Sequence, residues 1–359
     1  MKKALIAMSG GVDSSVAGYL TIKEGYECYG VTMKLFDSAD ATLSRSHSCC
    51  SMDDIKDARS VAEGLGMPYE VIDFSERFKE KVLDDFVYRY ENGMTPNPCI
   101  RCNRYLKFDK LLTHACELGC EIIVTGHYAR NHYDEKRGRW QLMKALDDTK
   151  DQSYVLYLLT QDMLSKTRFP LGEMKKADAR KIAGECGFVT AEKKDSEDLC
   201  FVKEGSYTDF IKQRTGKDYP PGDFVNLAGS VMGQHKGIIG YTIGQRKGLG
   251  LSLKEPAYVT ALDIPNNRVI LGRNEDLFKR ELWADEVNMV SWESIDEPVR
   301  LKAKVRYRHN EEWAVAEIKD GRLHVVFDEP VRAITRGQAV VLYDGDVVVA
   351  GGTITEIGE

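Results

Sequence analysis

Short apolar runs alternate with amphipathic segments along the first two hundred residues of this chain. The apolar runs have the length of strands and cover residues 4–8, 27–35, 69–74 and 121–124. The amphipathic segments place apolar side chains at helical spacing over residues 12–23, 53–66, 78–90, 105–118 and 175–186. A further helix is expected to open at Lys150. Strands that alternate with helices predict an α/β doubly wound parallel sheet, which binds ligands at the carboxyl ends of its strands.

The pattern changes after residue 201. Glycine and proline become frequent over residues 220–248, which predicts a small central domain of short strands. From about Trp283 apolar residues alternate with polar ones, and Asp320 and Asp344, each followed by glycine, mark hairpin turns. Such strands favour a C-terminal β-barrel. We therefore expect three domains, at residues 1–202, 203–280 and 281–359.

The composition is that of a soluble globular protein. The chain has 359 residues and a formal net charge of −6, which disfavours a nucleic-acid partner unless basic residues gather locally. No apolar run reaches the ~18 residues that span a bilayer, and the first strand begins at once. We therefore expect a cytoplasmic protein with no membrane partner. In a reducing compartment its nine cysteines favour catalytic, metal-binding or core roles.

One segment of the C-terminal domain provides a local gathering of basic residues. Its members alternate with apolar residues, so the period of a strand puts them on one face. Like charges without an acid between them favour binding to a phosphate backbone. A solvated edge strand that is protected by its charge is the alternative. The basic residues are Arg300, Lys302, Lys304, Arg306 and Arg308, and a second RNA-facing element is expected at Arg246 and Lys247.

The segment from Ser9 to Ser14 lies where the first predicted strand turns into the first predicted helix. Its sequence is Ser-Gly-Gly-Val-Asp-Ser. Such a junction points backbone N–H groups and the positive end of the helix dipole at one spot, which favours a phosphate. Gly10 and Gly11 allow the tight turn, and Asp13 is expected to cap the helix or to help hold a metal ion. No Lys-Ser or Lys-Thr pair follows the glycines, so this is not a Walker P-loop.

Two cysteines follow a proline-rich loop, residues 95–98, which we call the Pro-loop. Pro96 and Pro98 are expected to prevent a helix in this loop, which would place Cys99 and Cys102 at the start of the helix that follows. A thiol at a helix N-terminus beside arginines is expected to have a lowered pKa. Redox chemistry, metal binding and no role all remain open for this pair, with function favoured. Cys200 follows a charged run and is also expected to be reactive.

Other polar residues carry weaker signals. His127 follows the predicted strand at residues 121–124, so we expect a polar contact at the site rather than a place in the core. Cys49 and Cys50 lie near His47, but no second pair of ligands follows at the usual spacing. A loop is therefore favoured over a zinc site at these cysteines.

Together these motifs resemble those of a known family. The run at residues 9–14 resembles the PP-loop of the N-type ATP pyrophosphatases, which split ATP between its α- and β-phosphates. Over essentially the whole length, the chain resembles the bacterial tRNA 2-thiouridylase family within that superfamily. The further motifs are Thr-Pro-Asn-Pro-Cys-x-x-Cys-Asn at 95–103, Thr-Gly-His-Tyr at 125–128, Lys-Asp-Gln-Ser-Tyr at 150–154, Ser-Glu-Asp-Leu-Cys-Phe at 196–201, Tyr-Thr-Ile-Gly-Gln-Arg-Lys-Gly at 241–248 and Arg-Tyr-Arg at 306–308.

The resemblance implies a tRNA-uridine 2-sulfurtransferase that acts on the wobble uridine. ATP would adenylate the C2 carbonyl oxygen, with Mg²⁺ offsetting charge on the pyrophosphate, and a cysteine persulfide would supply sulfur. The implied catalytic residues are Cys102, the nucleophile, and Cys200, which carries the sulfur. The implied ATP contacts are Ala7, Met8, Ser9, Gly10, Gly11, Val12, Asp13, Ser14, Met33 and Gly126. The implied contacts to the target base and tRNA are Asn97, Pro98, Cys99, His127, Lys150, Asp151, Gln152, Arg306, Tyr307 and Gln338.

The resemblance also implies partners. These are tRNA isoacceptors for Lys, Glu and Gln, and a cysteine desulfurase or sulfur-relay protein as the sulfur donor. By the same resemblance, the fold is a PP-loop domain followed by a small central domain and a C-terminal β-barrel that binds tRNA.

Cys99 departs from the family pattern, because many relatives have aspartate there. Cys99, Cys102 and Cys200 are also the three ligands that would hold a [4Fe–4S] cluster with one iron open, a second route to the same product. The residues alone leave both routes open. Two rival functions are a small-molecule adenylating ligase of the PP-loop superfamily, which needs neither the cysteines nor the basic strand, and a non-catalytic RNA-binding protein.

Overall fold

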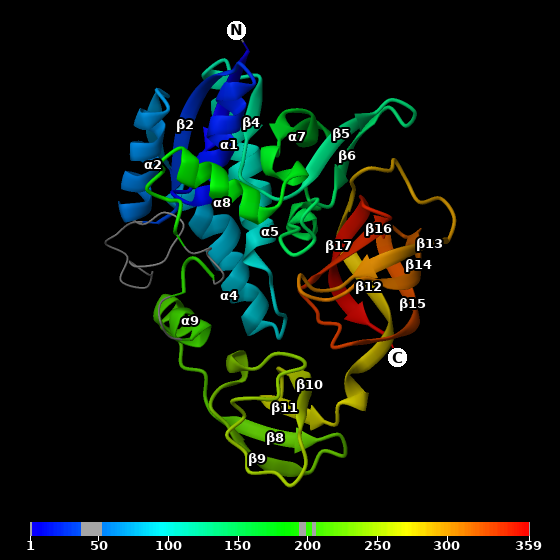
Figure 1. Cartoon of the computed structure of the whole chain (residues 1–359). Helices are drawn as coiled ribbons and strands as arrows, with labels where there is room; N and C mark the ends of the chain where they lie inside the picture. The colour runs from blue at the N-terminus through cyan, green and yellow to red at the C-terminus, as the bar shows by residue number, and fades with distance from the viewer. Residues whose placement is uncertain (1, 37–51, 194–198, 203–205, 359) are drawn as a thin grey trace.

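The computed structural model describes residues 2–36, 52–193, 199–202 and 206–358. His47, Cys49 and Cys50, for which a loop is predicted, lie outside the described residues. An α/β body at the N-terminus lies beside a C-terminal barrel, and a small β-rich body follows the first along the chain (Figure 1). In the described part of the chain, no helix combines the length and the apolarity needed to cross a membrane.

The N-terminal body is built on a five-stranded parallel sheet of order β3-β2-β1-β4-β7. β1 pairs with β2 on one side, where Ala7 lies opposite Val31, and with β4 on the other, where Ile6 lies opposite Val124. The strand order therefore reverses at β1, which creates a crevice for ligands at its carboxyl end. The predicted doubly wound sheet is confirmed. The strands are β1 (Lys3–Ala7), β2 (Glu27–Lys34), β3 (Tyr69–Asp73), β4 (Ile122–Val124) and β7 (Thr167–Arg168).

Helices cover both faces of this sheet (Figure 1). α1 and α2 pack on one face against Ala4 and Ile6. The long helix through α5, η2 and α6 packs Phe108 on the other face against Leu5 and Ile123. The helices are α1 (Val12–Lys23), α2 (Met52–Gly64), α3 (Ser75–Phe78), η1 (Lys79–Leu83), α4 (Asp84–Glu91), α5 (Pro98–Cys102), η2 (Asn103–Lys110), α6 (Leu111–Glu117), η4 (Pro170–Glu173) and α8 (Lys176–Glu185).

The helix that carries the two Pro-loop cysteines begins earlier than predicted. Pro98 is its first residue, and the Cys99 N–H donates to the Asn97 side-chain oxygen at 3.1 Å, so Asn97 caps the helix. Proline is tolerated at this position because the first helical N–H has no partner within the helix. The expectation that both prolines exclude helix is therefore wrong for Pro98. Cys99 and Cys102 lie one turn apart on the same helix.

A second difference lies after Lys150. The expected helix is replaced by a short 3₁₀ turn, η3 (Ser153–Leu156), and a separate helix, α7 (Gln161–Ser165). The Asp151 carboxylate accepts hydrogen bonds from the N–H groups of Ala145 and Ser153, both at 3.1 Å. These bonds favour a turn over a continuous helix.

The central body follows α9 (Tyr207–Thr215) and contains a four-stranded sheet of order β10-β11-β8-β9. Phe201 and Phe210 pack against Phe86 of α4, with ring centroids 5.1 and 6.1 Å apart. The core of the central body therefore continues into the N-terminal body. Its strands and turns are β8 (Gly222–Asn226), β9 (Val231–His235), η5 (Ile238–Gly240), β10 (Tyr258–Asp263), β11 (Arg268–Gly272) and η6 (Glu275–Leu277).

Six strands close the predicted barrel in the order β12-β15-β14-β13-β16-β17, because β12 pairs again with β17. Asp320 and Gly321 have φ values of 51° and 75°, as a type I′ hairpin between β14 and β15 requires. The barrel and its hairpins are confirmed. The strands are β12 (Phe278–Met289), β13 (Val299–Lys304), β14 (Glu312–Lys319), β15 (Arg322–Arg332), β16 (Ala339–Asp344) and β17 (Val347–Ile357).

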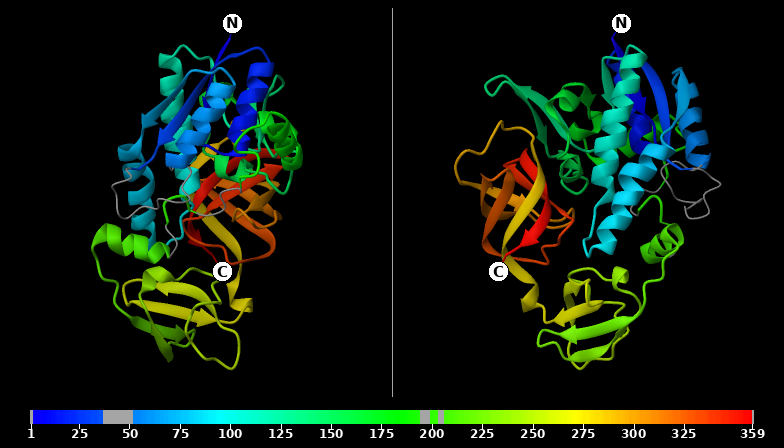
Figure 2. Two further views of the ribbon diagram at one scale, coloured as in Figure 1. Left: turned by 60° about the vertical axis from the view of Figure 1, so that its left-hand side comes forward. Right: turned by 180° about the vertical axis from the view of Figure 1, so that it is seen from behind.

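A hairpin that the sequence pattern did not predict joins the two largest bodies. Its strands are β5 (Arg130–Asp134) and β6 (Arg139–Met143), and Leu142 of β6 lies opposite Val348 of β17. The N-terminal body thus adds two strands to the barrel sheet. The view from behind in Figure 2 shows the hairpin projecting beside the barrel.

Candidate active site at the carboxyl end of the sheet

The PP-loop, residues 9–14, is shaped by two close backbone approaches. Gly10 has a φ of +72°, and a Cβ there would lie 2.7 Å from the backbone carbonyl carbon of Asp54. A Cβ on Gly126, just after β4, would lie 2.7 Å from the backbone of Asp13 and Ser14. Only glycine fits at either position. The loop that results is a compact turn ahead of a 12-residue helix, a geometry that binds anions through backbone N–H groups.

Lys176 binds the acidic residue of this loop from a distant part of the chain. Its Nζ lies 2.7 and 2.8 Å from the two carboxylate oxygens of Asp13, and the Tyr128 hydroxyl donates to the same carboxylate at 2.8 Å. The N-cap of α1 is Gly11, and no side chain in the described part of the chain caps this helix. The expectation that Asp13 caps α1 is therefore wrong, because its carboxylate is held by Lys176 instead.

Lys193 supports the same loop from the other side. Its Nζ bonds to the carbonyl oxygen of Gly10 at 2.9 Å and to the carboxylates of Asp54 and Asp57 at 2.6 and 2.7 Å. Burial disfavours the charged ammonium, but the bonds to Asp54 and Asp57 outweigh it and hold the pKa of Lys193 above its ordinary value. Sequence reasoning missed both lysines, since 163 and 183 residues separate them from their PP-loop partners. The charged run that begins at Lys193 was the one local signal in the sequence for either lysine.

The residues expected to bind ATP are gathered by the sheet. The Met8 N–H donates to the Val31 carbonyl at 2.8 Å, which aligns the carboxyl ends of β1 and β2. Met33 follows on β2, and Gly126 touches the first turn of α1 from the end of β4. The whole set therefore lies around the switch point of the sheet. Contact between these residues and ATP stays a prediction.

His127 lies in the core. It is 8% exposed, and its ring packs against those of Phe108 and Phe169, with centroids 5.8 and 6.2 Å away. Its Nδ1 shares a 2.8 Å hydrogen bond with the Thr125 hydroxyl. Burial holds the pKa of His127 well below its ordinary value, so the ring is neutral. In this arrangement His127 fixes the turn after β4, and its expected contact with tRNA stays a prediction.

The three candidate cysteines are not equivalent. Cys102 is 8% exposed, and Cys200 packs against the same hydrophobic cluster, which includes Phe201. Cys99 is exposed and lies within electrostatic range of the Tyr307 hydroxyl of the barrel. Within the described ranges, no three His, Cys, Asp or Glu side chains gather closely enough to hold a metal ion.

The Pro-loop is docked on the barrel. The Thr95 N–H donates to the Arg336 carbonyl at 2.8 Å, and Gln338 Nε2 donates to the Thr95 carbonyl at 2.7 Å. Below the loop, Arg101 binds Glu286 at 2.5 Å. Gln338, expected to contact tRNA, therefore holds the loop that presents Cys99.

The Lys150–Gln152 segment links this region to the PP-loop side. The Tyr128 N–H donates to Gln152 Oε1 at 2.9 Å, and the Gln152 N–H returns a bond to the Tyr128 carbonyl at 2.8 Å. Asp151 lies within electrostatic range of Tyr307, and Lys150 is half-exposed beside it. Hydrogen bonds therefore run from Asp13 through Tyr128 to Gln152, whose neighbour Asp151 acts electrostatically on Tyr307.

The basic strand differs from the prediction at its end. Strand β13 ends at Lys304, and the chain then turns, so Arg306 leaves the face shared by Arg300 and Lys302. Arg306 Nη2 donates to the Ile243 carbonyl at 3.0 Å and to the Thr335 hydroxyl. The expectation that all five basic residues share one strand face is therefore wrong beyond Lys304. Of the apolar residues between them, Leu301, Ala303 and Val305 are buried, as expected, but Tyr307 is 36% exposed, so the expectation that it packs inward is wrong.

Three family models match successive parts of the chain. They describe a tRNA methyl transferase HUP domain at residues 2–204, a tRNA methyl transferase PRC-barrel domain at residues 208–273 and an aminomethyltransferase beta-barrel domain at residues 279–354. Over 354 residues the chain is 47% identical to the tRNA-specific 2-thiouridylase MnmA of Clostridioides difficile, covering 98% of each protein. The chain belongs to the tRNA-specific 2-thiouridylase family.

Other members of the 2-thiouridylase family match over the same length. Identity is 48% to MnmA 2 of Caldanaerobacter subterraneus, covering 98% of this chain and 97% of that relative. It is 45% to MnmA of Acetivibrio thermocellus, covering 98% of this chain and 99% of that relative. A solved 4-thiouridine synthetase in complex with RNA and bound ATP has a TM-score of 0.33 and 16% identity over 60% of this chain and 50% of its own, a likeness too weak to support an argument.

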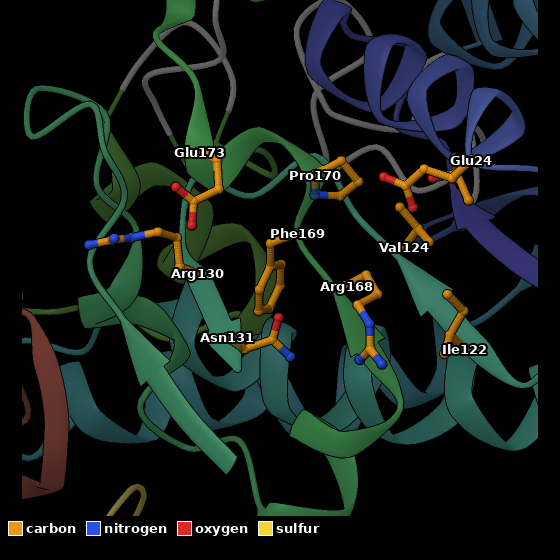
Figure 3. A pocket seen from close by; sticks show the side chains of 10 residues that line it. Glu24, Ile122, Val124, Arg130, Asn131, Arg168, Phe169, Pro170 and Glu173 are labelled. Carbon is orange, nitrogen blue, oxygen red and sulfur yellow. The ribbon is translucent and has the colours of Figure 1, made fainter. Parts of the chain in front are cut away.

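This 2-thiouridylase-family chain also has a cavity of about 150 Å³ near the β4–β7 edge (Figure 3). Arg130 and Arg168 both line it, and their side chains donate to the carbonyls of Lys144 and Thr167 at 2.6 Å. None of the residues expected to bind ATP or tRNA lines this cavity. The remaining lining residues are Thr21, Glu24, Ile122, Val124, Asn131, Phe169, Pro170 and Glu173.

Proposed function

We propose that this protein uses ATP to replace the C2 oxygen of the wobble uridine of tRNA with sulfur. In this proposal, residues 1–202 form the catalytic domain, residues 203–280 the central domain and residues 281–359 the tRNA-binding barrel. The names of the full-length relatives support a tRNA 2-thiouridylase activity.

The observation that carries the proposal is the connection between an anion-binding turn and a cysteine-bearing helix at the barrel. The Tyr128 hydroxyl bonds to Asp13 in the PP-loop, and the Tyr128 backbone bonds to Gln152. The neighbouring Asp151 lies within electrostatic range of Tyr307, as does Cys99. A nucleotide on the PP-loop and a base near Cys99 would therefore approach each other across Tyr128.

The PP-loop would hold the pyrophosphate end of ATP. Its backbone N–H groups and the N-terminus of α1 favour the phosphates, and Lys176 neutralises the Asp13 carboxylate, which would otherwise repel them. The uridine C2 carbonyl is a poor electrophile with a poor leaving oxygen. Adenylation of that oxygen makes it leave as AMP, and pyrophosphate is the other product.

The two clustered cysteines would then deliver sulfur. In one route, the terminal sulfur of a Cys200 persulfide attacks C2 and AMP leaves. The Cys102 thiolate next attacks the Cys200 Sγ, which breaks the S–S bond, leaves the thiocarbonyl on the base and forms a Cys102–Cys200 disulfide. In the other route, Cys102 attacks first and releases hydrosulfide, which then attacks C2. Both routes need an external thiol reductant to reset the disulfide, and the shared cluster around Cys102 and Cys200 supports both.

Metal groups fit less well. Both oxygens of the Asp13 carboxylate are bonded to Lys176, so Mg²⁺ would have to arrive with ATP and find other oxygens. For a [4Fe–4S] cluster, the described Cys99, Cys102 and Cys200 do not form a three-ligand group.

The partners and location follow from the activity. We propose that the substrates are the tRNA isoacceptors for Lys, Glu and Gln in the cytoplasm. A cysteine desulfurase or a sulfur-relay protein would load Cys200.

The test is pyrophosphate release from ATP, measured with and without unmodified tRNA, together with 2-thiouridine in the recovered tRNA. The proposal expects AMP and pyrophosphate as products, a strong stimulation by tRNA, and thiolation when a sulfur donor is present. Release of ADP and phosphate would contradict the PP-loop assignment. Pyrophosphate release that is the same with and without tRNA would indicate a small-molecule ligase. Binding of tRNA without any pyrophosphate release would indicate an RNA-binding protein.

A further inference from the structure

Three cationic side chains and a histidine meet where the barrel touches the central body. Lys304, Arg306 and His309 come from the end of β13 and the turn after it, and Arg332 ends β15. Together they are called the cationic cluster below. The positive charges of Arg306, Arg332 and Lys304 all act on His309, and burial together with these charges lowers the pKa of that imidazole.

Both arginines of the cluster approach the same loop of the central body. Arg306 Nη2 donates to the carbonyl of Ile243 at 3.0 Å. A Cβ on the neighbouring Gly244 would lie 3.7 Å from Arg332 Nη1. Both guanidinium groups therefore lie near residues 243–244 of the central body.

The charges of the two arginines in the cluster are not balanced by the protein. Arg306 bonds to a carbonyl and a hydroxyl, and Arg332 Nε bonds to the Asn274 side-chain oxygen at 3.0 Å. Within the described residues, no carboxylate lies within 4 Å of Arg306, Arg332 or His309, and the buried Arg306 Nε has no hydrogen-bond partner. Lys304 is the exception, since Asp151 and Glu311 act on it.

Other arginines of the barrel show the contrast. Arg322, at the opposite end of β15, binds Asp285 at 2.7 Å, and Arg300 binds Asp328 at 2.6 Å. Like charges held together without counter-charges repel one another, and a bound anion would relieve that repulsion. Guanidinium forks suit the oxygens of a phosphate.

From this geometry we infer that the cationic cluster binds one backbone phosphate of the tRNA next to the target uridine. The inference rests on the proposed function and deepens it. Tyr307 follows Arg306 directly and lies within electrostatic range of Cys99. A base held between Cys99 and Tyr307 therefore brings one of its own phosphodiester linkages to the cluster. Such a contact fixes the register of the strand without reading its sequence.

The first test is the salt dependence of binding. Arg332→Gln is compared with Arg322→Gln, the same change at the other end of the same strand, using full-length protein and unmodified tRNA. Arg332→Gln is expected to weaken binding about tenfold and to lower the slope of log affinity against log salt by about 0.7, as for one single-stranded phosphate. Arg322→Gln is expected to keep the wild-type slope. Equal slopes for wild type and Arg332→Gln would overturn the inference.

The second test identifies the phosphate and excludes a merely structural effect. tRNAs that carry one uncharged methylphosphonate linkage in the anticodon loop are bound to wild type and to Arg332→Gln. At one linkage beside the wobble uridine, the neutral group is expected to weaken binding to wild type but not to the variant. If the loss of affinity from the methylphosphonate and the loss from Arg332→Gln simply add at every linkage, Arg332 contacts none of these phosphates and acts only through the fold. A wild-type protein that binds no tRNA would overturn the proposed function itself, whereas tRNA-stimulated pyrophosphate release with additive losses would overturn only the phosphate site.

Discussion

Replacement of Gly126 by alanine tests where the nucleotide lies. The new Cβ would sit 2.7 Å from the backbone of Asp13 and Ser14, whereas carbon atoms pack at about 3.5–4.0 Å. Both neighbours are backbone atoms and cannot rotate away, so the first turn of α1 must move from β4 by about 1 Å. A displacement of that size at a catalytic group costs about 100-fold in rate. Overpacking of this kind also lowers the free energy of unfolding by about 1–3 kcal/mol.

The assay is tRNA-dependent pyrophosphate release over a range of ATP concentrations, with thermal unfolding in parallel. Gly184→Ala is the matched control, because it makes the same change in α8, where a Cβ meets open space. The control is expected to keep full activity and to gain up to about 1 kcal/mol of stability, since alanine favours helix over glycine. Wild-type kinetics for Gly126→Ala would refute the view that ATP binds between β4 and the first turn of α1.

Three further perturbations test other parts of the site. Lys176→Met leaves the Asp13 carboxylate of the PP-loop without its cation. We therefore expect at least a tenfold loss of pyrophosphate release, a free energy of unfolding lower by about 1–3 kcal/mol, and unchanged tRNA affinity. Normal turnover would exclude a role for this lysine. Cys99→Ala should retain measurable thiolation and Cys102→Ala should abolish it, whereas a dead Cys99→Ala enzyme and iron in anaerobically purified wild type would favour the cluster route. Burial alone would raise the pKa of Glu286, but its bond to Arg101 outweighs burial and lowers that pKa. The Glu286–Arg101 pair therefore stabilises the fold above the ordinary glutamate pKa, and this stabilisation is lost as the pH falls through the lowered pKa. The stability gap between wild type and Glu286→Gln should therefore close below about pH 4, and a gap that widens in acid would contradict this assignment.

The fold was largely predictable because its buried elements have clear periods. Strand β1 and helix α1 appear where an apolar run meets helical spacing, and the barrel hairpins appear at the Asp-Gly turns. The β5–β6 hairpin was missed because its exposed half is polar and Gly138 gives only a weak turn signal. Its pairing with β17 depends on residues some 200 positions away, which no local pattern records.

The residues of the candidate site were predictable only where they belong to a continuous sequence motif. The PP-loop and the Pro-loop cysteines are local strings, but Lys176 and Lys193 reach the PP-loop through tertiary contacts alone. His127 was expected to face the site because it follows a strand. Its burial is set by Phe108 and Phe169, which lie on other elements.

The seam between the N-terminal body and the barrel is part of one core. A single buried cluster contains Leu5 of the sheet, Tyr154 and Tyr157 of the connecting turn, and Tyr343 and Val348 of the barrel. The three tyrosines are at most 1% exposed. Because burial of each large side chain contributes about 1.5–3 kcal/mol, opening the seam would cost about 5 kcal/mol or more and would populate an open state in fewer than about one molecule in a thousand. We therefore expect the barrel to stay docked on the N-terminal body when tRNA binds. The surface that presents Cys99 and Tyr307 is preformed, and specificity must come from which tRNA can deliver its wobble base to that fixed surface.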